Sequence, residues 1–172
     1  MNDEPILGHD TWESVVAVLA RHMRDLGITS PAKPIRDMSG DRPWPSDLDV
    51  VSFDELGWWL GHLAGWLAYS RAQAGLARAV RVFAEERVRG IKARAFRESK
   101  HEKVTDRRAE ADEHADVVGQ LGLVALGHSK ATLLEALIEG LADKYNAISR
   151  EIARREAAFR ASGNSGCVGG VL

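Results

Sequence analysis

The chain has 172 residues, of which 45% are hydrophobic and 28% charged, and its formal net charge is −2. This length is enough for one domain with a core, and the composition excludes a disordered protein. The sequence has no uncharged apolar run of about 18 residues, and its acidic start lacks the regions of a signal peptide. We therefore expect a soluble cytoplasmic protein. Its single cysteine, Cys167, excludes an internal disulfide.

The small net charge conceals a strongly basic central stretch. Residues 71–108 carry 12 Lys and Arg against 5 Asp and Glu, whereas residues 1–70 have a net charge of −6 and residues 109–172 of −3. Because the local field attracts an anionic partner more than the total charge does, we expect the function to reside in this stretch.

The first predicted element is an amphipathic helix over residues 10–26, within an N-terminal segment 1–27. Apolar residues recur there at helical spacing, Asp10 is placed as the N-cap, and Gly27 ends the helix. A proline-rich loop or linker follows over residues 28–51. Trp44, between two prolines of this loop, is interpreted either as an anchor in a groove or as an exposed contact residue.

A long helix is predicted from Ser52, which forms a capping box with Glu55, to about Ser99. Its tryptophans are interpreted as core or subunit-interface side chains: Trp58, Trp59 and Trp66. Its small residues are expected to allow close approach of another helix: Gly57, Gly61, Ala64, Gly65 and Ala68.

Helix is predicted again over residues 104–160, either as one helix with a local kink near Gly127 or as two helices separated there. Apolar positions Val117, Leu121 and Val124 start a 4/3 spacing that returns, shifted by one residue, from Leu134 to Ile152. This spacing favours coiled-coil-type packing. The expected fold class is all-α, a long-helix bundle, with residues 52–161 as a nucleic-acid-binding and oligomerisation domain and 162–172 as a flexible tail.

Most cations of the basic stretch fall on one side of an ideal helix, within an arc of about 100°. They are Arg71, Arg78, Arg81, Arg89, Lys92, Lys100 and Lys103. Leu76, Val80, Phe83 and Ile91 fall on the opposite side, toward which Arg87 and Arg94 also project. The face is either a solvated, salt-bridged surface or a track for a polyanion. Since no base-reading motif is present, nucleic-acid binding would be sequence-tolerant.

The order of features over residues 52–155 resembles the UvsY-like phage recombination mediator family. The motifs are GIKARAFRES at 90–99, Lys103-Val-Thr105 before an Ala-Asp pair, and a terminal helix with Ser149 and Arg150. The resemblance implies a ring-forming homo-oligomer that binds single-stranded DNA and helps a RecA-like recombinase displace single-strand-binding protein. It implies that Lys92 and Arg94 contact DNA, although they project about 160° apart on an ideal helix, with Arg94 the weaker member. Arg94 and Arg97 complete the candidate nucleic-acid-binding set.

Enzyme patterns are weak, so we expect no catalytic residues, metal or cofactor. A glycine-rich phosphate loop is missing, and the Glu98–His101 pair lacks the second such motif that a di-iron bundle needs. Two alternatives to the mediator remain. One is a helical structural or virion-assembly protein with a basic protein-binding face. The other is an all-α nucleotide pyrophosphohydrolase whose carboxylates would be Glu110, Glu113, Glu139 and Asp143.

Overall fold

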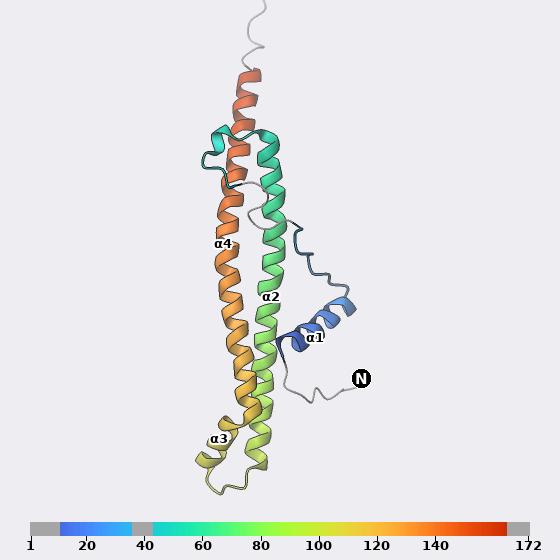
Figure 1. Ribbon diagram of the computed structural model, residues 1–172, viewed down its shortest axis with the longest axis vertical. Coiled ribbons are helices and arrows are strands. Elements are labelled where there is room, and N and C mark those ends of the chain that lie inside the picture. The colour runs from blue at the N-terminus through green and yellow to red at the C-terminus, as the bar shows by residue number, and fades with distance from the viewer. Residues whose placement is uncertain (1–10, 36–42, 165–172) are drawn as a thin grey trace, which may run out of the picture. The chain divides into compact units, whose positions relative to one another are not determined.

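The computed structural model describes residues 11–35 and 43–164 and confirms the all-α class. In these ranges the chain forms helices and no strand (Figure 1). The elements are α1 (Trp12–Asp25), a 3-10 turn η1 (Leu48–Val50), α2 (Phe53–Glu98), α3 (Val104–Glu113) and α4 (Ala115–Asn164).

The two ends of α1 are fixed by local hydrogen bonds. Thr11 is the N-cap and forms a capping box with Ser14, in which each side chain accepts from the other residue's backbone N–H, at 3.2 and 3.0 Å. The N-cap predicted at Asp10 is therefore one residue too early, and Asp10 itself lies outside the described residues. At the other end Gly27 has φ +73°, and the N–H of Ile28 donates to the carbonyl of Met23. This is a Schellman ending, which requires the left-handed conformation that glycine adopts without strain.

The long helices begin and break at specific residues. Ser52 caps α2 as predicted, because its hydroxyl accepts from the backbone N–H of Glu55 at 3.2 Å. The second helical region is two helices, but its break lies at His114, whose ψ of 129° is extended. The break considered at Gly127 is wrong, since α4 runs through that residue without interruption and reaches Asn164. Residues 165–172 of the predicted tail lie outside the described residues.

The chain divides into two compact units, and both long helices contribute to each of them. The first unit contains the chain up to Ser30 together with Ala72–Glu135, and the second contains Pro31–Arg71 together with the chain from Ala136. In the first unit α1 packs against α2 and α4. The fully buried residues of that cluster are Val15, Val80, Ala84 and Leu123.

In the first unit the buried side of α4 departs from the predicted register. Gln120 is 6% exposed, whereas Leu121 is 46% exposed. The buried positions are Val117, Gln120, Leu123, Gly127 and Ala131. They continue without a shift into the apolar spacing from Leu134 onward, so the predicted one-residue shift is wrong. The cause is Gly127, where a β-carbon would lie 3.0 Å from the carbonyl oxygen of Ala77 on α2. Small residues, rather than leucines, mark the close contact between these helices.

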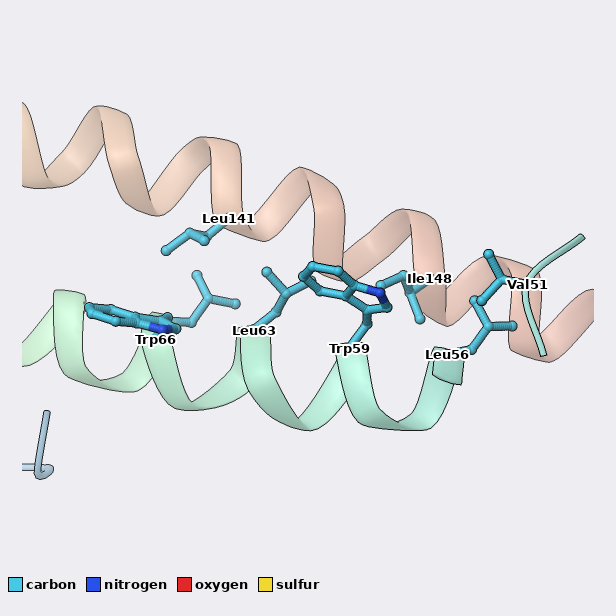
Figure 2. Packing of buried hydrophobic residues seen from close by; sticks show 8 residues of the cluster. Val51, Leu56, Trp59, Leu63, Trp66, Leu141 and Ile148 are labelled. Atoms are coloured by element: carbon cyan, nitrogen blue, oxygen red, sulfur yellow. The ribbon is translucent and has the colours of Figure 1, made fainter. Parts of the chain in front are cut away.

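The core of the second unit is built around the tryptophans of α2. Trp59 is 1% exposed and lies among Leu63, Ile148 and the neighbouring apolar side chains of α4 (Figure 2). Trp66 is also buried, which confirms both residues as core side chains. Trp44 packs edge-on against Trp59, with ring centroids 5.4 Å apart, so it anchors its loop.

The described chain brings no helix close to the glycines of α2 that were predicted to allow such an approach, Gly57, Gly61 and Gly65. A β-carbon added at Gly57 or Gly61 would meet nothing within 4 Å. The glycine that does permit a close helix contact is Gly127, which the sequence pattern suggested as a kink or as a break between two helices.

An arginine latch in the second unit holds the turn η1 against α4. The guanidinium of Arg155 donates to the carbonyl oxygens of Val51 at 2.6 Å, Leu48 at 2.7 Å and Asp49 at 3.0 Å. It also donates to the buried carboxylate of Glu151 at 2.5 Å. Hydrogen bonds from Arg154 and Arg155 lower the pKa of Glu151 to about 2. The latch therefore joins residues that are about a hundred positions apart in sequence.

Candidate nucleic-acid interface

Four cations of the predicted basic face form ion pairs with acidic side chains in the first unit. Arg78 pairs with Glu135 of α4, and Lys92 pairs with Asp112 of α3 at 2.6 Å. Within α2 itself, Arg81 lies 3.4 Å from Glu85 and Arg89 lies 2.7 Å from Glu86. This part of the face is the salt-bridged surface that the sequence left as one of two interpretations. A phosphate binding there would first have to displace a carboxylate.

The remaining predicted cations are exposed. Arg97 donates from Nε to the backbone carbonyl of Ala93 at 3.1 Å, which leaves the rest of its guanidinium accessible. Arg94, Lys100 and Lys103 are exposed and make no ion pair with the residues that the structure describes. Arg71 is exposed as well, but it belongs to the second unit, where it lines a different hollow beside Tyr145 and Asn146.

A hollow in α2 gathers three arginines around an apolar floor. Its volume is about 430 Å³, and its lining includes Arg87, Arg94 and Arg97 with Phe83, Glu86, Gly90 and Ile91. The arginines are spaced i, i+7 and i+10, which places them on one side of the helix. The space beside Gly90 is open, since a β-carbon there would meet nothing within 4 Å. The single acid in the lining, Glu86, is paired with Arg89.

This hollow has the chemistry of a site for a planar or phosphorylated anion. Guanidinium groups present several N–H donors that match phosphate oxygens, and they also stack on flat rings. Phe83 and Ile91 add apolar surface beside the charges. Guanidinium, aromatic and aliphatic groups therefore lie together along one side of α2.

The structure separates the two residues that the family resemblance joins. Lys92 faces Asp112 of α3, whereas Arg94 lines the hollow with Arg87 and Arg97. Arg94 is the more accessible of the two, contrary to the ranking drawn from helical projection. The projection missed this because it did not include the acidic helix that follows in the chain.

Arg87 is the residue that sequence reasoning left out of the candidate set. It projects toward the apolar side of α2, where it was expected to snorkel or to pair with an acid. Its spacing of seven residues from Arg94 was the available signal, because residues seven apart share a helix face.

The carboxylates of the hydrolase alternative belong to different units. Glu110 and Glu113 lie in α3 of the first unit, and Glu139 and Asp143 lie in α4 of the second. Over residues 11–35 and 43–164, no group of three or more His, Cys, Asp or Glu side chains is placed to hold a metal ion.

No protein-family model, curated protein or solved structure matches this chain. The resemblance to the recombination mediators therefore rests on the short motifs of residues 90–155 and on the helical order.

Proposed function

We propose that this chain is a non-enzymatic helical protein that binds single-stranded DNA through its phosphates. The observation that carries the proposal is the hollow of Arg87, Arg94 and Arg97 on α2. As a further step we propose that the bound strand is delivered to a RecA-like recombinase in place of single-strand-binding protein. That step rests on the family resemblance.

The charges of the first unit support a local contact rather than a continuous track. Arg78, Arg81, Arg89 and Lys92 are engaged by carboxylates. Those of the predicted set that are exposed and without an ion pair in this unit lie toward the end of α2 and in the loop after it, from Arg94 to Lys103. A strand bound there would meet a few cations, so its affinity would be moderate and dependent on salt.

The test is binding of a fluorescently labelled dT oligonucleotide at about 50 mM salt and above. Arg94→Ala/Arg97→Ala should weaken binding about tenfold and reduce the slope of log affinity against log salt by about 1.4. The matched control is Arg160→Ala, which removes one exposed cation far along α4 and should leave binding nearly unchanged. No binding by the wild-type chain at low salt would refute the proposal. Unchanged affinity in the double variant would refute the hollow as the site.

The recombinase step has a separate test. The chain should shorten the lag before a RecA-like recombinase forms filaments on an oligonucleotide coated with single-strand-binding protein. If the chain binds DNA but leaves this lag unchanged, the proposal of DNA binding stands and the proposal of delivery to a recombinase is refuted.

The assembly alternative predicts a different outcome at the same hollow. A basic protein-binding face would take an acidic peptide at Arg87 and Arg94, and would not take an oligonucleotide. A labelled poly-Glu peptide is therefore included beside the dT oligonucleotide. Preferential binding of the peptide would replace the nucleic-acid proposal.

A further inference from the structure

A hollow beside Trp44 in the second unit has the composition of a small-molecule site. Its volume is about 300 Å³, and its lining comes from the loop before α2, from α2 and from the middle of α4. All of these residues belong to the second unit. Ligand pockets begin at about this size and occur between the helices of bundles. The large apolar residues of the lining are Trp44, Trp59, Leu63, Leu137 and Leu141.

The apolar wall of the hollow is part of the folded core. Trp59 and Leu63 are each 1% exposed, and Leu141 is 5% exposed. Figure 2 shows these side chains pointing into the space between α2 and α4. Trp44 extends the wall, because its ring meets that of Trp59 edge to face, at an interplanar angle of 72°. The wall is therefore formed before any ligand arrives, so binding need not order it.

Small residues of α4 leave the hollow open. Gly140 is exposed, and a β-carbon added there would meet nothing within 4 Å. Ala136, which lies one turn earlier and also lines the hollow, adds only a methyl group. A long side chain at Gly140 would therefore occupy the space that a ligand needs.

The charged residue of the lining has no acidic partner in the described chain. Lys144 is exposed and lies one turn after Gly140, with its ammonium 5.1 Å from the centroid of the Trp44 ring. Over residues 11–35 and 43–164 it makes no ion pair. A lysine ammonium has three N–H donors, and a contact with a ring face does not use them all. The donors of Lys144 are therefore available to an external anion.

We propose that this hollow binds a small carboxylic acid with an apolar body, its carboxylate on Lys144 and its body against Trp44 and Leu63. Charge complementarity selects the carboxylate, because the residues that line the hollow include one cation and no acid. The body leaves water as it enters, and the contact between ammonium and carboxylate orients it. A neutral molecule would lack the second contribution. The proposal does not rest on DNA binding, since the arginine hollow belongs to the first unit.

An aromatic ring and a short acyl chain are the two kinds of body that the test distinguishes. Naphthoate and octanoate represent them, and the corresponding alcohols lack the charge. Isothermal titration calorimetry on the full chain should give a Kd of about 10–100 µM for at least one of the two acids. The tighter acid identifies the body. Its alcohol should bind about tenfold more weakly, because it loses the contact with the ammonium.

A lysine variant tests the carboxylate contact. Lys144→Met keeps the length of the side chain and removes its charge, so it should weaken binding of the acid about tenfold and leave the alcohol nearly unchanged. Lys130→Met is the matched control. Lys130 also lies on α4 with its ammonium over a tryptophan, 3.8 Å from the ring centroid of Trp12, but it does not line this hollow. This variant should bind the acid like the wild type.

A glycine variant tests the location. Gly140→Leu should fill the hollow and abolish binding with unchanged far-UV circular dichroism. Gly122→Leu makes the same change at an open position of α4 in the first unit and should bind normally. If Gly140→Leu fails to fold, the lysine variants and the alcohols still decide. The proposal would be overturned by a wild-type chain that binds neither acid, by an alcohol that binds as tightly as its acid, or by undiminished binding in Lys144→Met or in folded Gly140→Leu.

Discussion

Gly127 of α4 and Ala77 of α2 approach so closely that a β-carbon on Gly127 would lie 3.0 Å from the Ala77 carbonyl oxygen. It would also lie 3.1 Å from the β-carbon of Arg81 and 3.2 Å from its backbone nitrogen. Two of these three atoms belong to the helix backbone and the third is a β-carbon, so none of them can rotate aside.

Gly127→Leu should therefore lower the free energy of unfolding by about 1–3 kcal/mol through overpacking. Urea denaturation measures this change. Gly75→Ala is the matched control, because a β-carbon there meets nothing within 4 Å. It should stabilise the protein by about 0.5–1 kcal/mol, since alanine favours helix over glycine. A Gly127→Leu variant as stable as the wild type would show that the two helices do not meet at this residue.

Glu151 should make the free energy of unfolding depend on pH below about 4.5. Its pKa is lowered from 4.5 to about 2 in the folded chain by hydrogen bonds from Arg154 and Arg155. A depressed carboxyl pKa contributes stability above the unfolded value, and this contribution is lost as the pH falls from about 4.5 toward 2. Glu151→Gln should remove the contribution, so the stability difference between variant and wild type should shrink over that window.

Urea denaturation at a series of pH values measures this difference. Glu156→Gln serves as the control, because Glu156 is half exposed and lies 3.5 Å from the exposed Arg160. Exposed pairs of this kind contribute little, so this variant should follow the wild-type curve. A constant difference between Glu151→Gln and the wild type down to pH 2 would contradict the latch.

Trp59 should dominate the stability of the second unit. It is 1% exposed and packs against Trp44 and Trp58, with ring centroids 5.4 and 4.9 Å away. Trp59→Ala should cost about 3–5 kcal/mol, as for other large-to-small core changes. Phe159→Ala removes an aromatic ring that is 79% exposed and should change stability by no more than about 0.5 kcal/mol. Similar losses for both variants would place the core elsewhere.

Two helix ends were predictable because local chemistry determines them, whereas the N-cap of α1 was placed one residue too early. Ser52 and Gly27 act within one turn of their own helices, so their roles follow from sequence. For Trp44 the sequence left two interpretations open, and its packing against Trp59 decides for the loop anchor.

The register of α4 was not predictable from apolar spacing, since its buried side passes through Gln120 and Gly127. Hydrophobic periodicity weights Leu121 above Gln120, and it does not detect a glycine that is buried because another backbone occupies the space. The break at His114 was missed for a related reason. No proline or glycine marks it, and the two helices it separates read as one continuous pattern.

The candidate site was predicted in location but not in composition. The segregation of charge identified α2 as the location, because the distribution of charged residues along the chain can be read from the sequence alone. Which cations are accessible depends on the acids that the fold brings to them, and Glu135 lies 57 residues from Arg78. Such pairings across the chain are set by tertiary structure.

The short helix α3 places Asp112 where it competes with any external anion for Lys92. α3 has ten residues, of which Ala111 is buried, and its Asp112 places a carboxylate oxygen 2.6 Å from the Lys92 ammonium. Any anion that takes this lysine exchanges with a tethered carboxylate that is always present at high local concentration. Few mobile counterions are released in such an exchange, so binding at Lys92 would respond weakly to salt while binding at Arg94 would respond strongly. The chain thus contains, two residues apart, one cation with an internal competitor and one that faces solvent.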